Sequence, residues 1–226
     1  MDWKNFWDQF ARSEDPHQQV ARISKNDLPV DIVARITHYI MEQLEINEND
    51  HVLDVCCGNG VITKELANHC EHVTGVDLSP VQIENARETV PENVTLIEGD
   101  GLELSSLVPG QFDKALCYFS FQYFDTYRKG KQAIAEMAKV LKPGGKIFLG
   151  DVPDYDKRKA FYQTWDALLK NKIDRLLDRD AMGKFWQVEE LDRICQESGL
   201  RGQYMKQPEG MLYSHYRFDY LITKNV

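Results

Sequence analysis

Short apolar runs alternate with amphipathic stretches through the centre of the chain. The runs predict strands at 51–55, 72–76, 94–98, 113–118 and 145–150. The segments between them have helical spacing and predict helices at 60–68, 79–88 and 127–140. Strands that alternate with helices form parallel sheets joined by right-handed crossovers. The pattern therefore predicts an α/β fold with a doubly wound sheet.

The segments on either side of this region depart from the alternation. Residues 2–12 carry aromatic side chains at the spacing of one helix face, and a second amphipathic helix is expected at 29–44. After the fifth strand, 157–178 is expected to be one long helix with a single apolar face, followed by a loop at 179–186.

The last part of the chain predicts a helix at 187–198 and then two antiparallel strands. These strands span 200–206 and 211–223, and residues 207–210 form the turn between them. In the last strand the even positions are mostly apolar, whereas the odd ones include His215, Arg217 and Asp219. We therefore expect one apolar face and one polar face.

Composition narrows the class of protein. The chain has 226 residues, 42% of them hydrophobic, which suits one globular domain. A net charge of −9 argues against a nucleic-acid partner, because phosphate backbones attract basic surfaces. Five cysteines show no metal-ligand spacing, so no metal is expected. No leader and no apolar run of membrane-spanning length are evident, so we expect a cytoplasmic protein without a membrane partner.

The segment at 51–60 has the strongest functional signal. Its strand ends in Asp54, and Gly58 and Gly60 follow before a helix begins. A strand, a glycine turn and a helix form a nucleotide site at the carboxyl edge of a parallel sheet. The third glycine of a dinucleotide motif is missing, and a carboxylate at this place repels pyrophosphate and suits a cation.

This segment resembles the first motif of the class I S-adenosylmethionine-dependent methyltransferases, which is acid-x-Gly-x-Gly-x-Gly. Asp54, Gly58 and Gly60 match it, whereas Cys56 replaces the first glycine. A residue with a side chain fits there if its φ angle stays negative. The resemblance covers about residues 45–225. It implies S-adenosylmethionine as the cofactor and a seven-stranded sheet of order 3-2-1-4-5-7-6 with the last strand antiparallel.

Further segments match later motifs of the same family. The resemblance implies that Asp77, followed by Leu78, binds the ribose hydroxyls, and that Asp100 and Gly101 contact the adenine. It also extends to strand four, where Cys117 is a further cofactor-binding candidate, and to the turn at 142–145. The alternatives stay open: Ser79-Pro80 is also a helix start, and residues 99–101 also suit a strand-to-loop exit.

Two segments outside the motifs are expected to enclose the acceptor. We divide the chain into an N-terminal helical cap at 1–45 and a methyltransferase domain at 46–226, with a lid insertion at 152–186. We predict that this lid and the helix at 2–12 cover the acceptor pocket and become ordered when ligand binds.

The topology indicates where the acceptor lies. The tips of strands four and five and the start of the last strand share one rim, which gives the candidates Tyr118, Gln122, Tyr123, Asp151 and Tyr213. The aromatic cluster at 118–124 is equally typical of a core. His215 is the candidate general base, since imidazole titrates near neutral pH, and His17 is a substrate-pocket candidate and the second candidate base. A solvated strand histidine at His215, paired with Asp219 or with a backbone carbonyl, is the competing interpretation.

The function that these residues predict is methyl transfer from S-adenosylmethionine to a small-molecule acceptor, with oxygen favoured over nitrogen or carbon. The alternatives are a non-catalytic S-adenosylmethionine-binding regulatory protein and, less favoured, a methyltransferase that acts on a macromolecule. Methyltransferases of base amino groups place Asn/Asp-Pro-Pro-Tyr/Phe after strand four, where this chain has Cys117-Tyr-Phe-Ser120. The missing glycine and Asp54 disfavour a dinucleotide oxidoreductase.

Overall fold

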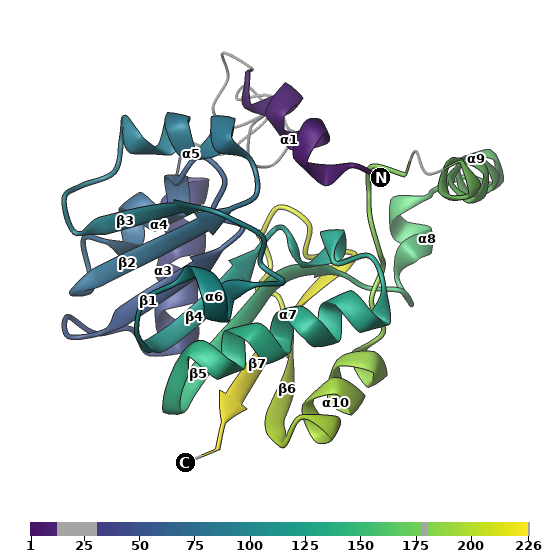
Figure 1. Ribbon diagram of the computed structural model, residues 1–226. Coiled ribbons are helices and arrows are strands. Elements are labelled where there is room, and N and C mark those ends of the chain that lie inside the picture. The colour runs from purple at the N-terminus through teal and green to yellow at the C-terminus, as the bar shows by residue number, and fades with distance from the viewer. Residues whose placement is uncertain (13–30, 178–179, 226) are drawn as a thin grey trace.

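A seven-stranded sheet of order β3-β2-β1-β4-β5-β7-β6 organises the chain (Figure 1). The computed structural model describes residues 1–12, 31–177 and 180–225. The strands are β1 (His51–Val55), β2 (His72–Asp77), β3 (Val94–Glu98), β4 (Phe112–Tyr118), β5 (Leu141–Pro153), β6 (Leu200–Lys206) and β7 (Arg217–Lys224). The first five are parallel, and β7 runs antiparallel between β5 and β6. The expected strand order and the antiparallel last strand are confirmed.

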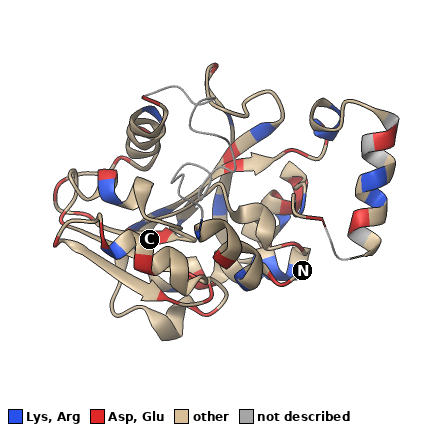
Figure 2. Ribbon diagram, turned by 90° about the horizontal axis from the view of Figure 1, so that it is seen from above, with Lys and Arg blue, Asp and Glu red and all other residues tan. Residues whose placement is uncertain are grey.

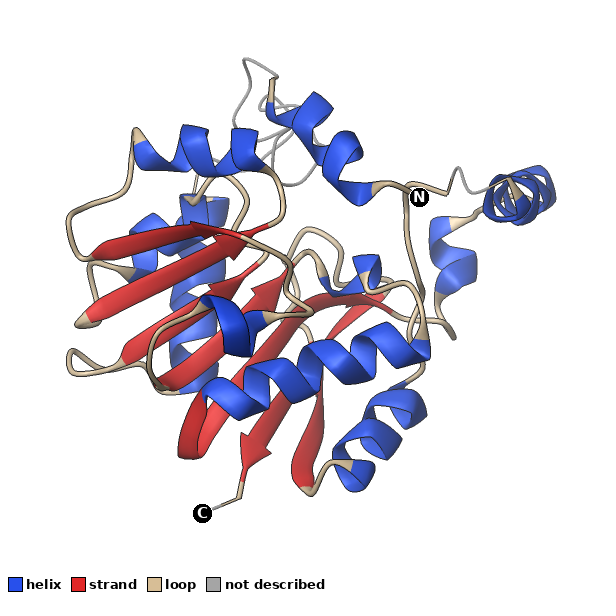
Figure 3. Cartoon of the chain, viewed as in Figure 1, coloured by secondary structure: helices blue, strands red, loops and turns tan. Residues whose placement is uncertain are grey.

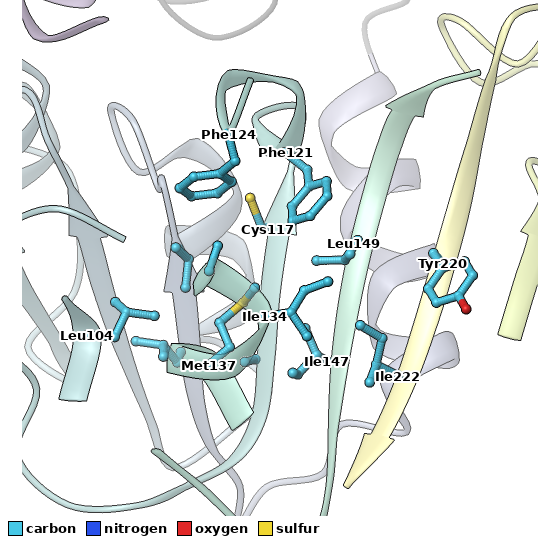
Figure 4. Close-up of a cluster of buried hydrophobic side chains, with 14 of the residues drawn as sticks. Leu104, Cys117, Phe121, Phe124, Ile134, Met137, Ile147, Leu149, Tyr220 and Ile222 are labelled. Atoms are coloured by element: carbon cyan, nitrogen blue, oxygen red, sulfur yellow. The ribbon is translucent and has the colours of Figure 1, made fainter. Parts of the chain in front are cut away.

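Helices cover both faces of the sheet and enclose two cores (Figure 3). On one face lie α3 (Ile32–Leu44) and α4 (Val61–Leu66), and on the other lie α6 (Leu104–Leu107), α7 (Tyr127–Val140) and α10 (Val188–Glu197). Figure 4 shows the second core, in which Ile134 and Met137 of α7 meet side chains of β5 and β7. Helix α5 (Pro80–Arg87) packs on β2 and β3.

Four short elements lie around the carboxyl edge of the sheet. Helix α1 (Trp3–Ala11) crosses above it, and η2 (Phe121–Tyr123) follows β4. Helices α8 (Arg158–Phe161) and α9 (Trp165–Leu176) stand at the same end, beside the N-terminal end of α1 (Figure 1). Within the described residues, no helix combines the length and apolar character needed to cross a bilayer.

The sequence-based boundaries are wrong in two places after β5. The expected helix at 157–178 is interrupted after Phe161, where Tyr162 leaves the helical region at φ −91° and ψ 80°, so α8 and α9 are separate helices. The last strand begins at Arg217, because residues 211–216 form turns. Arg217 and Asp219 are buried rather than solvated, since β7 is an interior strand with covered faces.

Candidate active site

Residues with a strained backbone conformation cluster at the carboxyl rim of the sheet. Four non-glycine residues of the described chain have a positive φ, and three of them stand at the ends of central strands. These three are Cys56 after β1, Phe119 after β4 and Asp151 near the end of β5, with φ of 61°, 61° and 60°. A left-handed residue with a side chain costs about 1–3 kcal/mol, and such residues cluster at functional sites. The rim is therefore the place to look for a site.

Asp54 is the acid at the end of β1. Its carboxylate faces a pocket at the rim and is 3% exposed. Thr63 of α4 donates to Asp54 Oδ2 at 2.6 Å. Burial raises the pKa of Asp54 to about 7, more than the hydrogen bond from Thr63 lowers it. Burial thus favours the protonated acid in the free protein, and a bound cation would favour the ionised form and lower this pKa.

Cys56 has the backbone geometry of a glycine. The condition under which a side chain fits easily at this position, a negative φ, is not met, because the residue adopts the left-handed conformation that glycine would take. The amides of Cys56 and Cys57 both donate to the carbonyl of Val76, at 2.7 and 3.1 Å, and fix the turn against the end of β2. The Cys56 thiol, which lines the pocket, interacts with the Cys117 thiol behind it.

The two glycines of the turn have different roles. Gly58, at φ 55°, lines the pocket, and a Cβ built there would meet no atom within 4 Å. Gly60 begins α4 at φ 76° and does not line the pocket; a Cβ there would lie 3.1 Å from the Ala86 methyl group on α5. Gly58 therefore leaves room for a ligand, whereas Gly60 permits the close approach of α4 and α5.

Asp77 joins this turn to the next strand. The amide of Gly58 donates to its Oδ2 at 2.8 Å, and the amide of Ser79 donates to its Oδ1 at 2.9 Å. Burial raises the pKa of Asp77 to about 6. A carboxylate offers about four lone-pair positions, so this one retains acceptors for two hydroxyl groups. Ser79 also caps α5 through Gln82, so the ribose and capping interpretations concern different residues.

The wall opposite the glycine turn comes from the loop after β3. Asp100 and Gly101 line the pocket, and Leu78 and Leu102 lie among its apolar walls. The Asp100 carboxylate accepts from the amide of Leu102 at 2.9 Å, which fixes the loop. Two leucine side chains at this end suit a flat, apolar ring.

The tip of β4 forms an aromatic wall. Tyr118, Phe119, Ser120 and Tyr123 all line the pocket, which places two of the predicted acceptor residues there. Gln122 does not line it, because the buried side chain instead donates to the Phe119 carbonyl at 2.5 Å. Gln122 thus supports the left-handed turn at Phe119.

Helix α1 closes the pocket from above. Trp3 and Trp7 both line it, and their rings lie 4.5 and 5.3 Å from that of Tyr123. Two polar contacts fasten the helix: Lys4 pairs with Glu98 at 2.8 Å, and Asp8 is hydrogen-bonded to the Ser79 hydroxyl. The helix at 2–12 was expected to cover the acceptor pocket, and two side chains of its aromatic stripe, Trp3 and Trp7, line the pocket found here.

Several predicted site residues lie outside the pocket lining. Cys117 is in the core between Phe121 and Phe124 (Figure 4), where it supports Cys56 from behind. His215 is exposed and packs on the ring of Tyr216 at 4.7 Å. Tyr213 is half-buried and its ring lies 6.4 Å from Phe119. His17 lies outside the described residues.

Asp151 belongs to a buried polar cluster behind the rim. Arg217 Nη1 donates to Asp151 Oδ2 at 2.7 Å, and the Asp151 amide donates to Asp219 Oδ1 at 2.7 Å. Gln207 bridges the two acids from Nε2, at 3.2 and 2.9 Å. Burial raises the pKa of Asp219 to about 7. The cluster holds β5 in its left-handed bend, and it replaces the expected pairing of His215 with Asp219.

Comparison with known proteins agrees with this geometry. Residues 52–145 match the family described as "Methyltransferase domain". A demethylmenaquinone methyltransferase of Staphylococcus aureus is 30% identical over 215 residues, covering 85% of this chain and 88% of that protein. The sterol 4-C-methyltransferase strm-1 of Caenorhabditis elegans is 31% identical over 135 residues, covering 56% of this chain and 39% of the longer relative.

The fold has solved counterparts as well. The N-methyltransferase NodS of Bradyrhizobium japonicum, crystallised with S-adenosyl-L-homocysteine, superposes with a TM-score of 0.69 over 99% of each chain. The two sequences are 19% identical, so this likeness concerns the fold.

The pocket also fits the cofactor that this fold suggests. S-adenosylmethionine combines an ammonium and a sulfonium with ribose hydroxyls and an adenine ring. Asp54 and Asp77 offer carboxylates whose raised pKa values a cation would lower, and Gly58 leaves open space beside them. The strand order, the acids at the strand ends and the similarity over most of its length place this chain in the class I S-adenosylmethionine-dependent methyltransferases.

Proposed function

We propose that this enzyme methylates an apolar, ring-bearing small molecule. The observation that carries the proposal is the aromatic wall of Trp3, Trp7, Phe119 and Tyr123 in one pocket. Aromatic side chains bind flat apolar molecules by offset or edge-to-face contacts and exclude water. A charged or highly hydroxylated acceptor would leave its polar groups without partners along this wall.

Some residues of the pocket would bind the cofactor, and others would shield the reacting groups from water. Asp54 would hold the cationic end of the cofactor, Asp77 the ribose hydroxyls, and the loop at Asp100 the adenine. Bound S-adenosylmethionine supplies an electrophilic methyl group on its sulfonium. The β4 tip and α1 orient the acceptor and exclude water, and such positioning contributes about 7–11 kcal/mol in well-oriented reactions.

The described lining of the pocket holds neither of the two histidines expected as a general base for the acceptor. Among the described residues that line the pocket there is no histidine, and its three acids are Asp54, Asp77 and Asp100, all assigned above to the cofactor. His215, the expected base, is exposed outside the lining. If the methylated atom is an oxygen, as the sequence favours, a phenol or enol that ionises readily fits best.

Methylation of a ring carbon is the second candidate. It is supported by the name of one relative, a sterol 4-C-methyltransferase. An ionised phenol also carries negative charge on its ring, so the same pocket suits both outcomes. The regiochemistry of the product, determined by NMR, separates them.

The test is release of S-adenosylhomocysteine with a series of phenols and hydroquinones of graded acidity and size. We expect rates that follow the acceptor's own ionisation, and equal rates for wild type and His215→Ala. A loss of about 10²-fold in His215→Ala would restore that residue as the base. Binding of S-adenosylhomocysteine without turnover of any acceptor would favour the non-catalytic alternative.

A further inference from the structure

An apolar surface is concentrated on the segment between β5 and α10. Seven large hydrophobic side chains are exposed in the described part of the chain, and six of them lie between residues 155 and 177. Four lie on or just after α9: Leu169, Ile173, Leu176 and Leu177, exposed by 58, 48, 86 and 54%. Isolated exposed apolar residues are ordinary, but a cluster of this kind marks an interaction surface.

The four residues form one stripe of the helix. Positions 169, 173, 176 and 177 follow the i, i+4, i+7, i+8 spacing of a single helix face. Figure 2 shows α9 at the edge of the molecule, apart from the sheet and its covering helices. None of the described residues in 152–186 lines the pocket, so the pocket does not account for this stripe.

The charge of the segment differs in sign from that of the whole protein. Residues 157–177 contain six basic residues, Lys157, Arg158, Lys159, Lys170, Lys172 and Arg175, and two acidic ones, Asp166 and Asp174. Residues 157–177 therefore carry a net charge of 6 − 2 = +4, and the whole segment between β5 and α10 carries 8 − 6 = +2, in a chain of net charge −9. Lys170 keeps its side chain 78% exposed although it pairs with Asp174.

An exposed apolar stripe beside basic residues is the pattern of a helix that lies on an anionic lipid surface. The apolar side chains enter the boundary between headgroups and acyl chains, while Lys and Arg contact the phosphates. We propose that α8 and α9 dock this protein on anionic membranes. The charge reversal selects this occupant, because an acidic protein is otherwise repelled by such a surface.

The position of the segment agrees with a role beside the pocket. Helix α9 and the N-terminal end of α1 lie at the same corner of the molecule (Figures 1 and 2). Docking through α9 would bring the pocket that Trp3 and Trp7 cover close to the lipid. An apolar acceptor dissolved in the bilayer would then reach the enzyme without crossing water. The docking itself does not depend on which acceptor is used.

The test is flotation of the full chain, without cofactor or acceptor, with vesicles of phosphatidylcholine alone or with roughly a third phosphatidylglycerol. We expect binding to the anionic vesicles only, weakened about tenfold or more when salt rises from about 0.1 to 0.5 M. Leu169→Glu with Ile173→Glu should abolish binding. Lys64→Ala with Arg87→Ala lowers the net charge by the same two units at exposed sites elsewhere and should bind as wild type does.

Two further measurements decide between docking and its alternatives. Calorimetry with S-adenosylhomocysteine should give the same affinity for all variants, which shows that they are folded. Light scattering should give the same mass for wild type and the Leu169→Glu, Ile173→Glu variant. Loss of a dimer in that variant, with no vesicle binding by wild type, would assign the stripe to a second copy and overturn the proposal. Equal binding to both kinds of vesicle would overturn the role of charge.

Discussion

Two short amphipathic helices, α1 and α9, lie at the same corner of the molecule and have opposite environments. Helix α1 buries its aromatic stripe against Tyr123 and is fastened by Lys4 and Asp8. Helix α9 exposes its leucine stripe. Both sequences predict a covered face, and only the structure identifies which face is covered by this chain. Amphipathicity thus predicts that a partner exists but not what the partner is.

The largest effect should come from the tryptophans of α1. Trp3→Ala with Trp7→Ala removes two pocket walls, so affinity for S-adenosylhomocysteine should fall about a hundredfold, since each lost aromatic contact is worth roughly 1.5 kcal/mol. The matched pair on α9, Leu169→Ala with Ile173→Ala, should stay within about twofold of wild type. Calorimetry measures both. An equal loss of affinity in the two double variants would show that α1 is no more important to the pocket than α9.

The next largest difference between α1 and α9 should be in how amide hydrogen exchange responds to ligand. S-adenosylhomocysteine is expected to slow amide exchange in α1 by about tenfold or more, because the helix then covers a filled pocket. Exchange in α9 should remain unchanged by the ligand and slow only with anionic vesicles. The lid predicted at 152–186 stays a prediction, and protection of α9 by ligand alone would support it.

Cofactor affinity should depend on pH, because Asp54 is buried in the pocket beneath α1. Asp54 has a pKa of about 7, so it is mostly protonated below that pH in the free protein. A cationic ligand prefers the ionised acid, so cofactor affinity should fall roughly tenfold between pH 8 and pH 6. Calorimetry in buffers of different ionisation enthalpy should detect proton release near pH 7. The Asp54→Asn variant should bind the cofactor weakly and release no proton near pH 7. If it releases as many protons as wild type, another group is the one that ionises.

The same pKa shift sets the pH dependence of folding. In the pH range from about 4 to about 7 the folded protein holds a proton on Asp54 that the unfolded chain has lost, so stability of the free protein should decrease as pH rises through that range. Asp77 and Asp219 shift in the same direction. Thermal unfolding of Asp54→Asn would show a shallower slope.

The smallest effect is expected from the exposed ion pairs of the two helices. Lys4→Ala breaks the contact with Glu98 that fastens α1, and Lys170→Ala breaks the pair with Asp174 on α9. Exposed pairs contribute little, so Lys4→Ala should weaken S-adenosylhomocysteine binding by about twofold and Lys170→Ala should not change it. A large loss in Lys4→Ala would show that α1 depends on this pair.

The strand order and the acids of the pocket were predictable because they rest on local signals. An apolar run that ends in an acid indicates both a strand and the position of its carboxyl end, as at Asp54 and Asp77. The resemblance to a known family then supplied the order of the strands.

The region after β5 was less predictable because its environment depends on distant partners. Arg217 and Asp219 alternate with apolar residues as a solvated strand face would, yet they are buried with Asp151, 66 and 68 positions earlier. The apolar residues of 157–178 have one helical period, which does not reveal the interruption after Phe161. After β1, the amides of Cys56 and Cys57 both donate to Val76, and Cys56 has a φ that no local preference of cysteine predicts.

The left-handed residues of the rim have a consequence for mutational tolerance. Glycine is ordinarily one of the most damaging replacements in a sheet, because it loses packing and gains freedom in the unfolded chain. At Cys56, Phe119 and Asp151 the backbone already adopts the conformation that glycine prefers. A β-branched residue would be disfavoured at each, and relief of backbone strain would offset part of what glycine loses. A complete mutational scan would therefore show the rim as three positions where glycine is less damaging, relative to β-branched residues, than at other positions of the sheet.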